Sequence, residues 1–445
     1  MEKQKVKWTG VALILLMVAV TFSGCVGQEE AGKETVTTTK FETVTTTEVK
    51  LETKLPEVIK IGIVLPLTGT LGWLGPDMVR GAQIAAHEIN RNGGIMGSKI
   101  ELIVEDSETT PEGSVESASK LVDIDKVQGI IGAAGSSNTL AIARGVTIDA
   151  NVILISPAST SPEITTVDDD DTLWRTAGPD TWQGRAMADL ADYMGWTTAG
   201  MMTVDNSYGI GLANAFDDAW DGTILRRVEY DPEVLAWEAE LALIAADEPD
   251  FFWLCCYAED GAEMMRELKE LAIDLPVMSA DGLGDINVVA DDDVASRISS
   301  PATIGTQPYT PESPGGVHFR ELWDEAHASE AAIEEWGLYE GAAVGDPVGI
   351  YAPESYDALN LLTMAISFAG EYTADAMKAW LRYVSTIYKP ASGDKTFDEY
   401  GDVAQDYNVY MFTGATVATA ALNVIGSWNA ITGLSIVTKP PHAPP

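Results

Sequence analysis

Short apolar runs alternate with helix-like segments along most of the chain, starting near residue 57. Residues 59–65 form the first apolar run, and Val79, Ala82 and Ala86 recur at helical spacing further on. The elements that this alternation predicts before residue 180 are strands 59–65, 100–105, 127–131, 152–155 and 173–175 and helices 77–90, 111–125 and 139–149. Repeated strand–helix units predict an α/β fold in which a mostly parallel sheet is covered on both faces.

A second series of the same kind starts near residue 181. Its predicted elements are helices 181–194, 209–220, 233–246 and 259–272 and strands 199–204, 224–230, 250–256 and 276–279. Beyond residue 300 the pattern loosens, and it predicts helices 353–369 and 374–384 and short strands near 408–413 and 431–437. The chain has 445 residues. This is too long for a single hydrophobic core, because such cores stop growing near about 250–300 residues. We therefore expect two doubly wound, Rossmann-like lobes with a cleft between them.

The first 25 residues have the pattern of a targeting segment. A basic start is followed by apolar residues 11–20, a run of about 10, whereas a membrane-spanning helix needs about 20. Small residues before Cys25 resemble the lipobox of a secreted lipoprotein, although Phe22 stands where Leu is usual. The alternative is an ordinary secretory signal with an incidental cysteine. Residues 26–56 are polar and rich in Thr, which predicts an extended linker outside the fold.

The formal net charge of −41 makes nucleic acid and anionic lipid surfaces poor partners. Cys255 and Cys256 lie in a predicted buried strand, so small apolar packing is a better explanation of them than a metal or redox site. The four histidines show no ligand spacing. The chain also lacks a Gly-rich phosphate loop with Lys and a Gly-x-Ser-x-Gly nucleophile turn. We expect no metal, no cofactor and no catalysis.

Residues 130–162 carry the strongest sign of a binding site. Two apolar strands in this range each lead into small hydroxyl-bearing residues, among them Ser136 and Thr160. Ligands of open parallel sheets bind beyond the carboxyl ends of the strands, and hydroxyl and backbone N–H donors suit a carboxylate. The alternative for both residues is that they cap the helices that follow them.

The order of motifs along residues 57–438 resembles the branched-chain amino-acid binding proteins of ABC transporters, which have the type I periplasmic binding protein fold. The segments that carry the resemblance are 59–62 (IKIG), 66–69 (PLTG), 81–82 (GA), 88–97 (EINRNGGIMG), 155–162 (ISPASTSP), 175–176 (RT), 183–184 (QG), 208–212 (YGIGL) and 280–283 (ADGL). The resemblance implies that each lobe is discontinuous and that three hinge strands join the lobes. The implied limits are 57–179 with 308–395 for the first lobe, 180–307 with 396–438 for the second, and a tail at 439–445.

The resemblance also implies the ligand contacts. Those to a carboxylate fall on Ser136, Thr160 and the backbone of Ala158 and Ser159. Tyr257 and Asp281 match positions that hold an α-amino group, although core packing and the Asp-Gly turn are the alternatives for these two residues. The matched wall positions are Tyr208, Tyr356 and Leu74, the last standing where the family has Trp, with Trp73 one residue before it.

The expected function is capture of an amino acid, branched-chain or otherwise apolar, by a receptor that delivers it to an ABC permease. A lipid anchor on Cys25 would hold this receptor at the extracellular face of the membrane. A sensor of the same fold is the alternative, and amides, urea and aromatic acids are alternative ligands.

Overall fold

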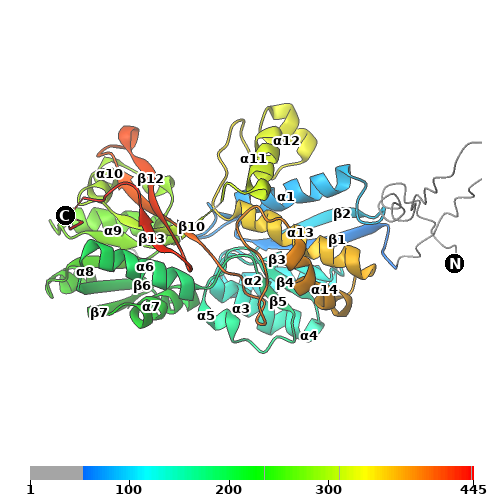
Figure 1. Cartoon of the computed structure of the whole chain (residues 1–445), viewed down its shortest axis with the longest axis horizontal. Helices are drawn as coiled ribbons and strands as arrows, with labels where there is room; N and C mark the ends of the chain where they lie inside the picture. The colour runs from blue at the N-terminus through cyan, green and yellow to red at the C-terminus, as the bar shows by residue number, and fades with distance from the viewer. Residues whose placement is uncertain (1–53, 235, 310, 442, 445) are drawn as a thin grey trace, which may run out of the picture.

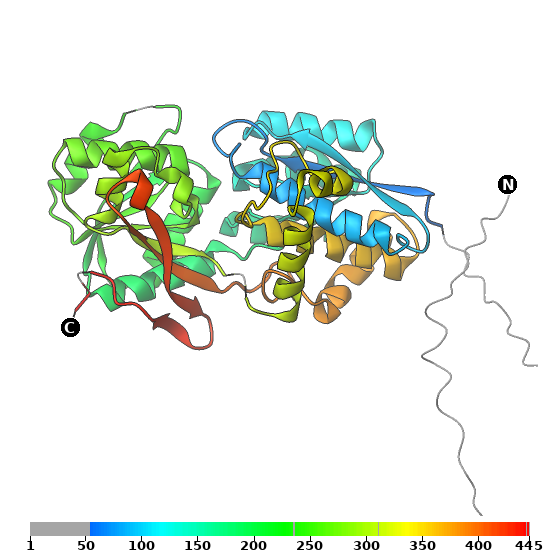
Figure 2. The same ribbon diagram turned by 90° about the horizontal axis from the view of Figure 1, so that it is seen from above.

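The computed structural model describes residues 54–234, 236–309, 311–441 and 443–444. These residues form two lobes that lie side by side along the longest axis, each around its own sheet (Figure 1). The view from above shows the same two bodies, which we call lobe 1, at the N-terminal end, and lobe 2 (Figure 2). Within the described ranges, no helix is both long enough and apolar enough to cross a membrane. The cysteine proposed for lipidation, Cys25, lies outside the described residues.

The sheet of lobe 1 has five parallel strands in the order β2-β1-β3-β4-β5. The strands are β1 (Val58–Leu65), β2 (Lys99–Asp106), β3 (Gly129–Gly132), β4 (Ile153–Ser156) and β5 (Leu173–Arg175). This is the doubly wound order in which a switch point separates β1 from β3. Side chains alternate across the sheet, so Ile61 and Ile63 enter one core and Val64 enters the other.

Helices cover both faces of this sheet, and four of them come from late in the chain. The helices of lobe 1 are α1 (Gly75–Arg91), α2 (Pro111–Asp123), α3 (Ser136–Ile142), α4 (Ile148–Ala150), α5 (Pro162–Thr165), α11 (Pro314–Ala326), α12 (Glu330–Trp336), α13 (Ala352–Ala369) and α14 (Ala374–Ile387). Helices α1 and α13 pack together over the face that Ile61 and Ile63 line. On the other face, α2 contributes Leu121 to the core around Val64.

The packing of α1 on α13 depends on Gly81. A Cβ atom at Gly81 would lie 2.2 Å from the carbonyl oxygen of Ala352, which is backbone and cannot rotate away. We expect Gly81→Ala to lower the free energy of unfolding by about 1–3 kcal/mol, because the two helices must move apart. Chemical denaturation measures the change. Gly145→Ala is the matched control, since its Cβ would meet Val115 at an ordinary 3.4 Å, and an equal loss in both variants would contradict the expectation.

The sheet of lobe 2 has eight strands in the order β13-β12-β11-β10-β9-β8-β6-β7. They are β6 (Thr198–Val204), β7 (Thr223–Tyr230), β8 (Phe251–Cys255), β9 (Val277–Ser279), β10 (Ile304–Pro308), β11 (Tyr407–Thr413), β12 (Ala421–Asn429) and β13 (Gly433–Ile436). Strands β6 to β10 are parallel, and β11 to β13 add antiparallel pairs. The helices of lobe 2 are α6 (Asp180–Met194), α7 (Ser207–Ala219), α8 (Glu238–Ala245), α9 (Ala258–Glu270) and α10 (Asp292–Ser299).

The chain passes between the lobes in the segments β5 to α6, β10 to α11 and α14 to β11. The prediction of an α/β fold with two wound lobes is confirmed, with a mixed rather than purely parallel second sheet. Six helices and strands were not predicted from the pattern: α5, α10, β10, α11, α12 and β12. The predicted helix 139–149 is also wrong in detail, because α3 begins at Ser136 and a π-helical turn, Ala143–Thr147, interrupts the segment.

Candidate functional site

The carboxyl ends of β3 and β4 bring two loops together at the edge of lobe 1 that faces lobe 2. The loop after β3 ends at Ser136, the first residue of α3. The Oγ atom of Ser136 accepts a hydrogen bond of 3.2 Å from the N–H group of Ser161 in the loop after β4. The sequence thus places its hydroxyl residues at one edge of the sheet, where ligands of such sheets bind.

The side chains of Ser156 and Ser159 hold the two loops in shape. The Ser156 hydroxyl donates to the carbonyl of Ala133 at 2.7 Å and accepts from the N–H group of Ser159 at 3.0 Å. The Ser159 hydroxyl lies 3.0 Å from the carbonyl of Ala134 and 2.8 Å from the hydroxyl of Thr139. The backbone N–H group and the hydroxyl of Ser159 therefore both have partners within lobe 1.

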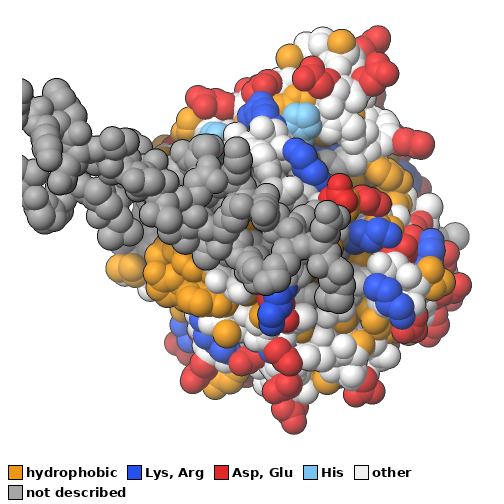
Figure 3. Space-filling model, turned by 90° about the vertical axis from the view of Figure 1, so that its right-hand side faces the viewer, with side chains coloured by type: hydrophobic (Ala, Val, Ile, Leu, Met, Phe, Trp, Pro, Cys, Tyr) orange, Lys and Arg blue, Asp and Glu red, His pale blue; other side chains and the backbone are white. Residues whose placement is uncertain are grey.

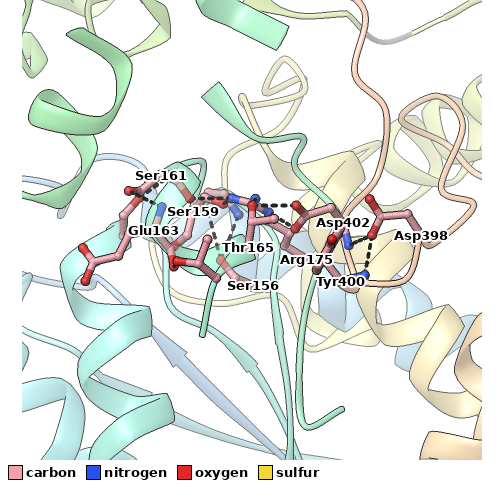
Figure 4. Close-up of polar contacts among 12 residues, drawn as sticks. Ser156, Ser159, Ser161, Glu163, Thr165, Arg175, Asp398, Tyr400 and Asp402 are labelled. Atoms are coloured by element: carbon pink, nitrogen blue, oxygen red, sulfur yellow. Dashed lines mark hydrogen bonds and ion pairs between the residues drawn. The ribbon is translucent and has the colours of Figure 1, made fainter. Parts of the chain in front are cut away.

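A buried ion pair between Arg175 and Asp402 lies next to the loop after β4 (Figure 4). The Nε atom of Arg175 lies 2.6 Å from Oδ1 of Asp402, a residue of the segment that leads to lobe 2. The same guanidinium donates to the carbonyl of Ser161 at 2.9 Å and to Oγ1 of Thr165 at 2.6 Å. Thr165 in turn donates to Oδ2 of Asp402 at 2.7 Å. One arginine thus fixes the binding loop relative to a crossing segment.

Lobe 2 contributes Asp281, which follows β9 and begins a short 3-10 helix. Its Oδ1 atom accepts from Nε2 of Gln183 at 2.8 Å and from the Tyr208 hydroxyl at 3.2 Å. Its Oδ2 atom accepts from the hydroxyl of Tyr351 at 2.7 Å, and Tyr351 directly precedes α13 of lobe 1. The bond between Tyr351 and Asp281 therefore crosses from one lobe to the other.

Burial raises the pKa of Asp281, while hydrogen bonds from Tyr351, Gln183 and Tyr208 stabilise its ionised form and lower it. A second buried carboxyl, that of Asp180, is close enough to interact with it. Burial and the charge of Asp281 raise the pKa of Asp180 well above its ordinary value. The hydroxyl and amide donors favour the ionised form of Asp281, whereas the charge of Asp281 disfavours ionisation of Asp180.

A small pocket of about 40 Å³ lies between the two loops of lobe 1 and Asp281. Its lining residues are Leu71, Trp73, Leu74, Ala134, Gly135, Ser136, Ala158, Tyr208, Tyr257, Asp281, Gly282, Ile350 and Tyr351. Tyr208 and Tyr257 stack with ring centroids 5.8 Å apart. A volume of 40 Å³ is close to the roughly 30 Å³ share of one water molecule. A larger ligand would extend into the adjoining cleft or require the lobes or Tyr351 to move.

An open cleft of about 780 Å³ adjoins this pocket. Leu71, Gly135, Ser136 and Tyr257 line both spaces. The cleft continues past Thr70 and Asn206 to the surface and provides a path along which a ligand reaches the pocket.

Six of the residues predicted for the site line the small pocket: Leu74, Ser136, Ala158, Tyr208, Tyr257 and Asp281. Ser159 and Thr160 lie behind it, and the Thr160 carbonyl accepts from the N–H group of Asp180 at 2.7 Å. The structure does not bring Tyr356 to the pocket. The Tyr356 hydroxyl instead donates to Glu88 at 2.6 Å, and its ring packs on Phe319.

Sequence reasoning missed Tyr351, Leu71 and the support from Arg175 and Asp402. Arg175 stood among the matched motifs, but its partner lies 227 positions later and carries no local signal. Tyr351 ends a Gly- and Ala-rich stretch without periodicity, so no pattern pointed to it. Trp73 was noted beside Leu74, and the structure places both in the wall.

Two α/β lobes with polar strand ends facing each other across a pocket define a two-lobed solute-binding protein. Residues 58–416 match the model of the periplasmic binding protein family, and the chain belongs to that family. A Leu/Ile/Val-binding protein of Rhizobium johnstonii is 27% identical over 369 residues, covering 81% of this chain and 94% of that protein. A substrate-binding protein of a chemotactic signal transduction system in Halobacterium salinarum is 26% identical, covering 82% and 85%.

Solved structures show the same fold. The crystal structure of a leucine binding protein from Thermotoga maritima superposes with a TM-score of 0.71 at 24% identity, covering 84% of this chain and 99% of that one. The predicted resemblance to the type I periplasmic binding proteins is confirmed by the family model and by this likeness. The three relatives described are all named as binding proteins.

Proposed function

We propose that this chain captures an amino acid with an apolar side chain and delivers it to an ABC permease. The observation that carries the proposal is the polarity of the pocket: donors from lobe 1 face a carboxylate from lobe 2. A zwitterionic amino acid needs hydrogen-bond donors for its carboxylate and an anion for its ammonium group. Charge-assisted hydrogen bonds of this kind are stronger than those between neutral groups. The Leu/Ile/Val-binding relative supports the ligand class by its name.

In this proposal, the Ser136 hydroxyl and the N–H group of Ala158 bind the carboxylate of the ligand. Asp281 binds the α-ammonium group, which displaces the Tyr351 hydroxyl as the partner of Oδ2. Trp73, Leu74 and the stacked tyrosines Tyr208 and Tyr257 surround the side chain of the ligand. Ser159 and Thr160 do not contact the ligand in this proposal but hold the loop after β4 in the shape that presents Ala158 to it.

The proposed mechanism is closure of the two lobes around the ligand by bending of the three crossing segments. The lobe limits that we propose are 57–179 with 308–395 and 180–307 with 396–438. The contacts of α13 and α14 with β3 and β4 support assigning residues up to the end of α14 to lobe 1.

We further propose that Cys25 carries a lipid anchor and that the protein works at the extracellular face of the cell membrane. The basic start, the short apolar run and the small residues before Cys25 support this location. The periplasmic binding protein family is consistent with it.

A sensory role is the second candidate, because the relative from Halobacterium salinarum is named for a chemotactic signal transduction system. In that role the same closure would signal to a membrane receptor, and the ligand could belong to the same amino-acid class. Amides, urea and aromatic acids remain the alternative ligands.

A thermal-shift screen of residues 54–445 against amino acids, simple amides, urea and aromatic acids tests the ligand class. Binding to the native state raises the melting temperature by mass action, so we expect a rise with one or more apolar amino acids. Responses confined to amides, urea or aromatic acids would contradict the amino-acid proposal.

A further inference from the structure

An aromatic patch lies around helix α14, in which Trp380 packs partly against the core of lobe 1 and its neighbours are exposed. The helix buries Met377, Leu381 and Val384 against the core. On its outer side lie four residues that we call the aromatic patch: Phe368 at the end of α13, Trp380, Tyr383 and Ile387. Phe368, Tyr383 and Ile387 are 44%, 50% and 46% exposed. Large apolar side chains gathered at one exposed place mark an interaction surface.

The three rings of the patch contact one another. The ring centroids of Phe368 and Trp380 are 5.4 Å apart, and those of Trp380 and Tyr383 are 5.9 Å apart. Phe368 meets Tyr383 edge to face at 5.7 Å. The rings thus form one preformed surface rather than separate exposed side chains.

The patch lies beside the point where the described chain begins. The N–H group of Lys54 donates to the carbonyl of Gly370 at 3.1 Å, and the Lys54 ammonium lies 2.5 Å from Glu371. Gly370 ends α13 directly after Phe368 and Ala369. Figure 3 views the molecule from this end and shows a broad apolar area among the charged side chains.

The proposed anchor is near this end of lobe 1 along the sequence. The 28 residues 26–53 are all that separates Cys25 from Lys54 along the sequence. An anchored molecule therefore keeps the membrane surface within reach of this end of lobe 1.

Helix α14 itself carries more basic than acidic residues, unlike the whole protein. Helix α14 has one acidic residue, Asp375, against Lys378 and Arg382, whereas the chain has a net charge of −41. Lys378 and Arg382 form ion pairs with Asp170 and Asp171. Asp169 and Asp398 also act on Arg382, so the acidic residues around α14 outnumber its two basic ones, and a lipid contact here has to come from the rings rather than from charge.

We propose that the aromatic patch rests on the lipid surface to which the protein is anchored. Trp and Tyr favour the membrane–water interface, where a ring sits at headgroup level with its polar atom in water. A second copy of this chain is a poorer occupant, because each copy carries the net charge of −41. The proposal rests on the proposed anchoring at Cys25.

Contact at this end would orient the molecule. The pocket lies between the lobes, whereas α14 and Lys54 lie toward the N-terminal end of lobe 1 (Figure 1). The pocket would therefore stay open to solvent while α14 touches the lipid.

Fluorescence quenching on vesicles tests the contact. The full chain, with an N-terminal His tag and the background change Trp8→Phe, is made by cell-free synthesis so that nothing is cleaved. It is bound to phosphatidylcholine vesicles that contain nickel-chelating lipid and brominated acyl chains. We expect quenching of Trp fluorescence and loss of most of it in Trp380→Phe. The matched control is Trp182→Phe, since Trp182 is a half-buried residue of lobe 2 that should not contribute.

Each outcome decides the proposal. Absent quenching, or equal quenching before and after Trp380→Phe, overturns it, as does a loss in Trp182→Phe that matches the loss in Trp380→Phe. Tyr383→Ser should weaken quenching without changing the circular dichroism spectrum, which separates contact from misfolding. A dimer in sedimentation that Tyr383→Ser dissociates would assign the patch to a second copy instead.

The tag separates the patch from the anchor. It holds the N-terminus at the vesicle whether or not Cys25 carries a lipid, so failed quenching speaks against the patch alone. Anchoring is tested separately by membrane flotation of the chain made in cells, compared with Cys25→Ala.

Discussion

Asp402→Asn should lower the free energy of unfolding by about 3–5 kcal/mol, the range for breaking a buried ion pair by removing one partner. The reason is that Arg175 has no exposed surface and would keep its charge without a counter-ion. The change also weakens the contact of Asp402 with Thr165. Urea denaturation measures the effect.

The matched control is Asp171→Asn, which breaks the pair of Arg382 and Asp171 on the surface. Both side chains of that pair are more than a third exposed, at 38% and 49%, so we expect a loss of at most about 1 kcal/mol. Similar losses in the two variants would show that burial of Arg175 does not raise the cost of losing its partner.

Asp281→Asn should weaken binding of the amino acid found in the screen by about 1.5–3 kcal/mol, or roughly 10- to 150-fold. The substitution keeps the size of the side chain and its acceptor oxygen but removes the negative charge that we assign to the ammonium group of the ligand. Isothermal titration calorimetry measures the change. Unaltered affinity would remove Asp281 from the site.

Tyr351→Phe is the control for this second prediction. It removes the hydroxyl that competes with the ligand for Oδ2 of Asp281 and leaves the carboxylate in place. Affinity should stay equal or rise. A fall as large as that of Asp281→Asn would mean that Tyr351 itself contacts the ligand.

The local sequence was sufficient to predict most of the residues that lobe 1 contributes to the pocket. Ser136 and Ala158 follow apolar strands directly, and the parallel order of β3 and β4 brings their ends together. The position of such residues follows from the strand that precedes them, because the carboxyl ends of parallel strands meet at one edge. That is why the order of motifs was enough to predict that both residues lie at the pocket.

The choice of Tyr356 instead of Tyr351 shows where local sequence is insufficient. Tyr356 lies within α13, which is buried along most of its length. From its place in the sequence, the side chain could point either into the core of lobe 1 or toward the pocket. Tyr351 adopts a φ of 63°, in the left-handed region, just before the helix and outside its periodicity. Only the packing of lobe 1 against lobe 2 decides which tyrosine reaches Asp281.

The same limit applies to the elements beyond residue 300. Strand β10 contains Gly305 and ends at Pro308, a composition that predicts a turn, yet it pairs on both sides with β9 and β11. Pairing with β11 depends on a segment about 100 residues later, which no local window contains.

The late position of α13 has a consequence for biosynthesis. Leu359 and Leu362 of α13 complete the core that Ile61 and Ile63 of β1 begin. The ribosome synthesises Ile61 and Ile63 about 300 residues before it reaches α13. Domains generally fold as units, which requires that all their parts have been synthesised. Until residue 369 has emerged, α1 covers only part of this face of the first sheet, so lobe 1 starts first and yet finishes only after most of lobe 2 has been synthesised.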